Sequence, residues 1–521
     1  MAHADMAGGR GASGGHEPTN EGMTMMEQLT GLDATFLYLE TPSLHMHVSM
    51  AAMFDPSTVP GGYSFDKLRD LVSSRLELAP IFRRRLVEVP FRLGHPYWVD
   101  DPNFDIEYHI RRGAVPAPGG VEELAQFVGD VCSRQLDRSK PLWEMYIVEG
   151  LRGGQIAVVT KIHHCTIDGV SGAELLSQLF DLEPEPPARP APDAPMSVDE
   201  RLPSDLHLMA QSVGTRLTRP LGMTKLAWRT GWALLDVRRV RARGQGRAAL
   251  PLTTPRTSLN AAITPHRRVA FSSISLEDAK RIKRACDTTL NDVVLAVCTG
   301  ALRRYLLDGD ELPDGPLVAT VPVSTAPTDA NRRGANKVSA MFVSLPCHIA
   351  DPVERLQSIR ENTKGAKEEH NALGADVLLN WAEHATPNVF SAAARAYTRL
   401  KLADHHRPIH SLVISNVPGP DFPLYLAGAE MVAGFPLGPV MDGAGLNITV
   451  MSYRGVLNWG LMACAETVPH LADLGAYIPD AIEELASAAK LAPTHAVGVA
   501  PGRPQPRQIV KSVHRTPQPT R

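Results

Sequence analysis

Apolar and polar residues recur along this chain with spacings that predict both strands and helices. The segments 143–149 and 156–162 are rich in β-forming residues, and the glycine-containing stretch 150–154 between them predicts a hairpin. Later β-rich runs lie at 318–323, 340–345, 411–417, 446–452 and 457–464. Strands interspersed with helical stretches favour an α/β (α+β) fold class.

Several stretches carry the start signals of helices. The segment 171–174 has capping-box spacing, Ser275 has the residue type of an N-cap, and Thr289 and Asp292 repeat the capping-box spacing. Asp308-Gly309 is a stop signal for the helix that Thr289 opens. Apolar residues at helical spacing predict the buried face of that helix: Val294, Val297, Cys298, Ala301, Leu302 and Tyr305.

Composition changes along the chain divide it into segments. A Gly/Ala/His-rich start is typical of disorder, a Pro-rich stretch near residue 186 is typical of a stiff linker, and the C-terminal end is basic and lacks acidic residues. We therefore expect a disordered extension, an N-terminal domain, a linker, a C-terminal domain and a disordered basic tail, at 1–25, 26–185, 186–262, 263–493 and 494–521.

The bulk composition excludes some classes of function. The chain has 521 residues, of which 44% are hydrophobic, and a net charge of −3, which gives no case for nucleic-acid binding. Its six cysteines are scattered, so neither a disulfide framework nor a zinc site is expected, and a reducing, cytoplasmic setting is favoured. There is no secretory signal and no apolar run of the ~20 residues that a membrane-spanning helix needs.

The chemistry-bearing segment is His163-His164-Cys-Thr-Ile-Asp168-Gly169, which follows a predicted strand. A histidine in a loop at a strand end can transfer protons near neutral pH. Asp168 could brace the loop, and Gly169 permits a turn that a side chain would crowd. A metal site is disfavoured, because adjacent residues of an extended chain point to opposite faces. These residues alone leave a structural and a catalytic histidine pair both open.

Further motifs decide between these alternatives. The pattern His-His-x-x-x-Asp-Gly resembles the CoA-dependent acyltransferase superfamily of chloramphenicol acetyltransferase and condensation domains. Between about Met26 and Ala489 the chain resembles, more narrowly, the bacterial wax ester synthase/diacylglycerol O-acyltransferase family, actinobacterial branch. The stretches that carry this resemblance are 32–40, 45–48, 141–144, 255–260, 290–294, 415–420 and 442–448. Cys165, where alanine is expected, and Ala326, where arginine is expected, depart from the family pattern.

The resemblance implies two chloramphenicol-acetyltransferase-like domains with mixed sheets, joined by a crossover linker, with a tunnel between them. It implies an enzyme that esterifies diacylglycerol, or a long-chain alcohol, with the acyl group of acyl-CoA. His164 would be the general base, His163 an orienting residue, and Asp168, with Gly169, a structural part of the loop. Acyl-CoA would be a substrate, so no cofactor and no metal are expected.

Other motif residues are candidates for the substrate path, each beside a structural alternative. Trp143, after Pro141 and Leu142, would line the acyl channel or simply start a strand. Asn291 and Asp292 would reach the active site or cap a helix. A third group would line the tunnel or form a rigid turn: Ser415, Asn416, Pro418 and Gly419. His45 and His47 alternate with apolar residues as in a strand.

The expected acceptor is a lipid, so we expect a peripheral contact with the inner membrane face or with lipid droplets. The stretch 216–247 has nine Lys/Arg, one acidic residue, and Trp228 and Trp232 one helical turn apart, which suits an anionic surface. A solvated helix covering the domain joint is the alternative. Two other functions stay open: a condensation-type enzyme that uses carrier-bound acyl groups, and a non-catalytic lipid-droplet protein. No pattern specifies an oligomeric state.

Overall fold

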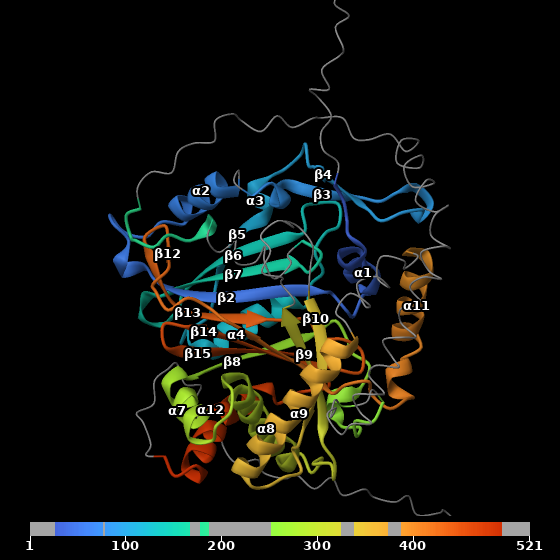
Figure 1. Ribbon diagram of the computed structural model, residues 1–521. Coiled ribbons are helices and arrows are strands. Elements are labelled where there is room, and N and C mark those ends of the chain that lie inside the picture. The colour runs from blue at the N-terminus through green and yellow to red at the C-terminus, as the bar shows by residue number, and fades with distance from the viewer. Residues whose placement is uncertain are drawn as a thin grey trace, which may run out of the picture.

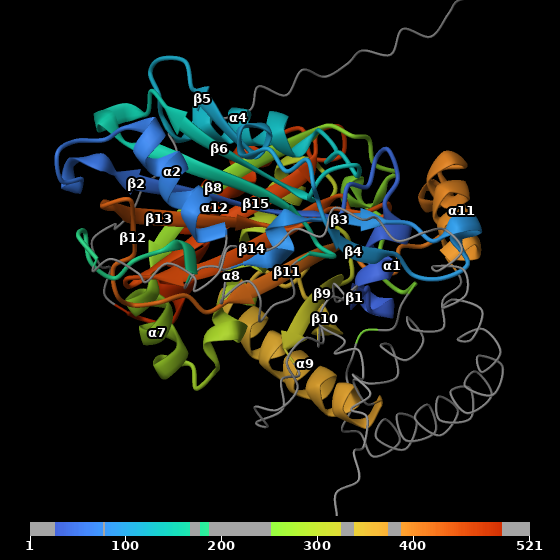
Figure 2. The same ribbon diagram turned by 90° about the horizontal axis from the view of Figure 1, so that it is seen from above.

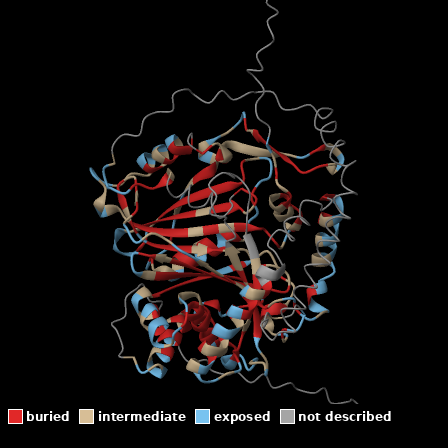
Figure 3. Cartoon of the chain, viewed as in Figure 1, coloured by how far each residue is buried: buried red, intermediate tan, exposed pale blue. Residues whose placement is uncertain are grey.

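A computed structural model describes residues 27–76, 79–166, 178–186, 249, 252–324, 338–373 and 387–491. These residues form two six-stranded mixed sheets and a small three-stranded sheet. In Figure 1 the two large sheets lie one above the other, with helices on their outer sides. The strands are almost entirely buried, as Figure 3 shows, so most of the apolar core lies on and between the sheets.

The first sheet has the order β12-β13-β2-β7-β6-β5, with β5 and β6 parallel and the other pairs antiparallel. Its strands are β2 (His47–Asp55), β5 (Ile110–Ala114), β6 (Trp143–Glu149), β7 (Ile156–His163), β12 (Tyr425–Leu426) and β13 (Ala429–Leu437). The helices α2 (Phe65–Leu76), α3 (Ile106–His109) and α4 (Val121–Cys132) belong to the same half of the chain. The predicted hairpin is confirmed as β6 and β7.

The second sheet has the order β10-β9-β11-β14-β15-β8, and β11 is parallel to both of its neighbours. Its strands are β8 (Arg267–Ser275), β9 (Leu317–Ser324), β10 (Val338–Leu345), β11 (Leu412–Val417), β14 (Leu446–Tyr453) and β15 (Val456–Cys464). Its helices are α7 (Leu276–Ala285), α8 (Leu290–Asp308), α9 (Pro352–Leu373) and α12 (Leu471–Ala488). All the strands predicted for this half are present.

The helix signals of the second half also act as predicted. Ser275 is the N-cap of α7 and accepts a hydrogen bond from the amide of Asp278. Thr289 and Asp292 form the capping box of α8, which ends at Asp308. Its predicted apolar stripe is buried. The capping-box segment 171–174 and the whole of 187–248 lie outside the described residues.

Smaller elements lie beside the first sheet. They are β1 (Glu27–Gln28), β3 (Arg84–Val87) and β4 (Tyr97–Asp100) of the third sheet, and α1 (Gly31–Leu39) and α11 (Pro387–Arg399), which contact each other. The single-turn 3-10 helices are η1 (Pro56–Thr58), η2 (Pro80–Arg83), η3 (Pro90–Arg92), η4 (Arg152–Gly154), η5 (Ser258–Asn260) and η6 (Leu402–Asp404).

An exchanged segment joins the two halves. β12 and β13 fall within the range 263–493 expected for the C-terminal domain, yet β13 pairs with β2 in the first sheet, where Phe435 lies opposite Ala51. β13 also packs on β14 and β15 of the second sheet. At Gly460 of β15 the contact is so close that a Cβ atom would lie 1.9 Å from the carbonyl oxygen of Pro436. The absence of a side chain therefore sets the distance between the sheets.

Replacing this glycine should destabilise the whole chain. We expect Gly460→Ala to lower the free energy of unfolding by about 3 kcal/mol or more, the upper end of overpacking effects, because the opposing atom is backbone. Gly315→Ala is the matched control, since a Cβ there meets nothing within 4 Å, and surface changes of that kind stay within about 0.5 kcal/mol. Urea denaturation measures both, and equal stabilities of the two variants would contradict this account of the joint.

Candidate active site

The candidate site begins at the end of β7. Successive side chains of this strand point to opposite faces, and both faces are buried. Lys161 is completely buried, and its ammonium group contacts the Glu144 carboxylate at 3.0 Å and two backbone carbonyls at 3.1 Å. His163 is two residues further on and therefore points to the same face as Lys161. His164 follows the last residue of the strand and faces the other way.

His163 is fixed on all sides. Its backbone amide donates to the carbonyl of Leu142 at 3.0 Å, and its carbonyl accepts from the amide of Thr166 at 2.9 Å. Its Nδ1 accepts a hydrogen bond from the amide of Cys165 at 3.1 Å. Because Nδ1 is an acceptor, the neutral ring carries its proton on Nε2. His163 cannot offer Nδ1 as a base without breaking the turn.

An ion pair lies against the other side of the His163 ring. Glu40 is paired with Arg138, and its carboxylate is 3.7 Å from His163 Nε2. Burial lowers the pKa of His163 well below its ordinary value, and the charge of Arg138 lowers it further. Burial raises the pKa of Glu40, and Arg138 opposes that rise. A neutral His163 beside a Glu40–Arg138 pair is therefore the stable arrangement.

His47 completes the surroundings of His163. It lies opposite His163 in the sheet, and the two rings meet edge to face with centroids 5.9 Å apart. Both ring nitrogens of His47 are buried, and neither has a hydrogen-bond partner among the described residues. Burial lowers the pKa of His47 well below its ordinary value, and the charge of Lys161 lowers it further. The side of the sheet that carries His47 and His163 thus holds uncharged imidazoles.

His164 has a different environment. It is half-buried, its amide donates to the carbonyl of Met46 at 2.9 Å, and its ring stacks on Phe36 of α1 with centroids 4.0 Å apart. Burial lowers the pKa of His164, and its own backbone carbonyl partly offsets that effect. Nδ1 of His164 is buried and has no hydrogen-bond partner among the described residues. The ring of His164 is therefore held by stacking, whereas that of His163 is held by a hydrogen bond.

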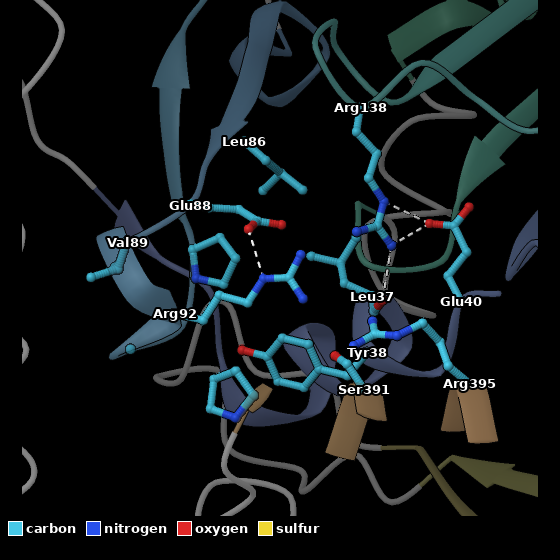
Figure 4. A pocket seen from close by; sticks show the side chains of 13 residues that line it. Leu37, Tyr38, Glu40, Leu86, Glu88, Val89, Arg92, Arg138, Ser391 and Arg395 are labelled. Atoms are coloured by element: carbon cyan, nitrogen blue, oxygen red, sulfur yellow. Dashed lines mark hydrogen bonds and ion pairs between the residues drawn. The ribbon is translucent and has the colours of Figure 1, made fainter. Parts of the chain in front are cut away.

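A pocket lies beside this loop, between α1, β3 and α11 (Figure 4). Its lining includes Glu40 and Arg138, and the ion pair between them is drawn in the figure. Arg92 and Arg395 line it as well. The pocket therefore joins the surface of the molecule to the ion pair behind His163.

The first candidate substrate motif packs into the core. Trp143 is 3% exposed, its Nε1 donates to the carbonyl of Phe82 at 2.8 Å, and its ring stacks on His109 at 4.5 Å. Leu142 accepts the backbone bond from His163, and its side chain is buried. Pro141 precedes the strand and is buried, as Leu142 and Trp143 are. A lining role for these residues stays a prediction.

Asn291 and Asp292 begin α8 in the second half. The Asp292 carboxylate accepts from the amide and hydroxyl of Thr289, at 2.9 and 2.7 Å, and from the hydroxyl of Thr363 at 2.7 Å. Asp292 is 2% exposed, so its capping role is established by geometry. Asn291 is half-buried. Any contact of this pair with substrate stays a prediction.

The third candidate group follows the central parallel strand of the second sheet. Ser415 and Asn416 are half-buried residues of β11, opposite Thr449 and Val450 of β14. Pro418 is exposed. Gly419 donates its amide to the Ser452 hydroxyl at 3.1 Å, and a Cβ on it would lie 2.1 Å from the Ser452 carbonyl. This geometry explains the glycine as a close-packed turn, and a tunnel-lining role stays a prediction.

Some predicted positions lie outside the described residues. They are Asp168 and Gly169 of the loop, Ala326, the basic stretch 216–247 and both terminal tails. In the part of the chain that is described, no group of three His, Cys, Asp or Glu side chains is arranged to hold a metal ion. No helix there is long and apolar enough to cross a membrane.

Sequence reasoning did not single out several residues that contact the two histidines. Phe36 and Glu40 come from the stretch 32–40, which carried the family resemblance, but their contacts depend on how α1 docks on β7. No sequence pattern singled out Arg138, because an arginine in a polar loop is usually a solvated residue. The fold brings these residues and His47 together around the pair.

Comparison with known proteins decides the family. A model of the wax ester synthase/diacylglycerol acyltransferase catalytic domain matches residues 29–294, and a model of the C-terminal domain of the same family matches residues 334–486. The chain belongs to the wax ester synthase/diacylglycerol acyltransferase family. Rv1760 of Mycobacterium tuberculosis, whose name assigns it provisionally to the diacylglycerol O-acyltransferases, is 40% identical over 90% of this chain and 92% of its own.

Solved structures agree with this assignment. The wax ester synthase/diacylglycerol acyltransferase of Marinobacter aquaeolei VT8 is 31% identical, with a TM-score of 0.64 over 89% of this chain and 100% of its own. A starter condensation domain of rhizomide synthetase shares only the fold, with 14% identity and a TM-score of 0.51 over 90% of this chain and 95% of its own. The expected α/β fold, with two acyltransferase-like halves and mixed sheets, is therefore confirmed.

Within this acyltransferase fold, His163 should matter for stability more than His164. His163→Ala removes the acceptor of the buried Cys165 amide, and an unsatisfied buried donor costs about 1–3 kcal/mol. His164→Ala removes a half-buried ring that has no regular hydrogen bond to another described residue. Urea denaturation of the two variants should therefore show the larger loss for His163→Ala. A larger loss for His164→Ala would contradict the anchoring role of His163.

Proposed function

We propose that this chain transfers the acyl group of acyl-CoA to the hydroxyl of diacylglycerol, or of a long-chain alcohol, with His164 as general base. The observation that carries the proposal is the difference between the surroundings of His163 and those of His164 at the end of β7. His163 accepts a hydrogen bond from the Cys165 amide, whereas His164 is half-buried and stacked on Phe36, and its Nδ1 has no hydrogen-bond partner among the described residues. Family membership supports the acyl donor and the acceptor class.

The proposed reaction needs one base and no covalent acyl-enzyme. His164 Nε2 takes the proton of the acceptor hydroxyl while the hydroxyl oxygen attacks the thioester carbonyl. The tetrahedral intermediate then breaks its carbon–sulfur bond, and the imidazolium returns the proton to the leaving thiolate. The products are an ester and CoA. The thioester is already activated, so one positioned base can serve both proton transfers.

The surrounding groups suit a base of this kind. Burial keeps His164 neutral, and stacking on Phe36 fixes the plane of the ring. His163, Glu40 and Arg138 hold the turn from its interior side and act as positioning residues. Asp168 is proposed to brace the same loop, with Gly169 allowing its turn, rather than to act on the substrate.

Two other functions are distinguishable by simple measurements. A condensation-type enzyme would use an acyl group on a carrier protein, so free acyl-CoA would be a poor donor. A lipid-droplet protein without activity would bind lipid but release no CoA. We favour the acyltransferase, because the chain is 40% identical to Rv1760 over 90% of its length and has the His163-His164 pair at the end of β7.

The proposed acceptor is nearly insoluble in water, so the enzyme must meet it at a lipid surface. We therefore propose peripheral association with the inner membrane face or with lipid droplets. The nine cations and the two tryptophans, Trp228 and Trp232, of the stretch 216–247 support this proposal by their composition.

The replacement His164→Ala tests the base. With purified protein, palmitoyl-CoA and diacylglycerol or hexadecanol, CoA release should fall by at least the ~10²-fold expected for loss of a general base. Cys165→Ala is a matched control, because it changes the next residue of the same loop to a small apolar one and should keep activity near that of the wild type. If His164→Ala folds normally and still releases CoA at the wild-type rate, His164 is not the base.

A further inference from the structure

The helix α11 presents an apolar stripe to solvent. Pro387 and Ser391 are buried against the rest of the molecule, as expected for one face of a surface helix. The opposite face would ordinarily be polar. Here Asn388, Arg395 and Arg399 are exposed, but apolar residues at spacings of three and four are exposed beside them: Val389, Ala392, Ala393, Ala396 and, just after the helix, Leu400. Val389 is 69% exposed and Leu400 61%.

A phenylalanine extends the same surface. Phe91 in η3 is 80% exposed, and both Phe91 and Arg92 have the left-handed backbone conformation, with φ of 55° and 52°. Side chains other than glycine and asparagine rarely adopt that conformation, so it costs free energy here. Asn388 in the first turn of α11 donates its side-chain amide to the Phe91 carbonyl at 3.0 Å. Figures 1 and 2 both show η3 beside the end of α11.

Cations surround these apolar groups. Arg395, Arg399 and Lys401 follow one another along α11 and just beyond it, and residues 387–403 contain no acidic side chain. None of the three forms an ion pair with any residue in the described part of the chain. Arg92, next to Phe91, pairs with Glu88 at 3.0 Å. Exposed apolar side chains among unpaired cations are the chemistry of a surface that meets anionic lipid.

Only α1 separates the exposed residues of α11 from the loop that carries His163 and His164. α11 packs on α1, whose Phe36 stacks on His164. Phe390 of α11 joins a buried apolar cluster that contains Leu142 and Cys165 on either side of the histidine pair. The pocket of Figure 4 lies between the same elements, with the exposed Arg395 and the Glu40 carboxylate both in its lining.

We propose that Phe91, Val389, Leu400 and the cations of α11 form a docking surface for an anionic lipid bilayer. This inference rests on the proposed function only in that the acceptor is a lipid; the surface itself is argued from the described residues. A second copy of the chain is a poorer occupant, because two such faces would bring unpaired cations together. Docking here would place the pocket, and the loop behind it, against the lipid that supplies the acceptor.

Flotation with vesicles tests the docking surface. The apolar variant is Phe91→Asn with Val389→Ser, in which asparagine tolerates the left-handed backbone of position 91. The charge variant is Arg399→Gln with Lys401→Gln, which leaves Arg395 of the pocket lining unchanged. Leu307→Ser is the matched control, because Leu307 is an exposed residue, 48% accessible, on α8. Vesicles of equal parts phosphatidylcholine and phosphatidylserine are compared with vesicles of phosphatidylcholine alone.

We expect both surface variants to bind the anionic vesicles about tenfold more weakly than the wild type and Leu307→Ser do, since each loses anchoring groups. Binding of the wild type should weaken at high salt, which shortens the screening length. Unchanged flotation of both variants would overturn the proposal. So would a change of oligomeric mass in the apolar variant without a change in flotation, because the face would then be covered by a second copy.

CoA release separates this proposal from the proposed function. With a soluble short-chain alcohol, the surface variants should match the wild type, whereas with vesicle-borne diacylglycerol they should be slower in proportion to their binding. A wild-type protein that floats as described but releases no CoA with any alcohol would end the acyltransferase assignment and leave the docking surface in place.

Discussion

The hydrogen bond from the Cys165 amide to His163 Nδ1 is the interaction on which the proposed active site depends. It closes the chain into a turn immediately after β7 and fixes the His163 ring in the interior. Because neighbouring residues of an extended chain face opposite ways, anchoring His163 also determines where His164 points. His163 serves as a structural hydrogen-bond acceptor, and the ring of His164 stacks on Phe36.

The rest of the structure holds this turn in place by burying it. β7 is central in the first sheet, between β2 and β6. Phe36 of α1 contacts His164, and Glu40, just after α1, lies beside His163. The exchanged strand β13 closes the same sheet on the far side of β2 and packs on the second sheet, where Gly460 permits contact with Pro436. Desolvation from these layers lowers the pKa of His47, His163 and His164, and the nearby cations Lys161 and Arg138 lower those of His47 and His163 further.

Much of the fold was predictable from local patterns, and the site only in part. The hairpin of β6 and β7 and the capped helix α8 follow from periodicity and capping residues, which are local properties. The exchange of β13 into the first sheet was not predicted, because strand pairing across hundreds of residues leaves no local pattern. Glu40 and Arg138 were not predicted for the same reason, because their positions beside His163 depend on long-range packing. Strand geometry alone predicts that neighbouring histidines point to opposite faces, and in the structure the two rings have different contacts, Glu40 beside His163 and Phe36 beside His164.

The most direct test of the account is the pH dependence of kcat/KM for acyl transfer, which reports the ionisation of the essential base in the free enzyme. His164 must be neutral to accept a proton, and burial lowers its pKa from the ordinary 6.5. The account predicts an acid limb of kcat/KM with its midpoint below 6.5, as His164 becomes protonated. An acid limb with its midpoint above 6.5 would contradict a buried, uncharged His164 as the base.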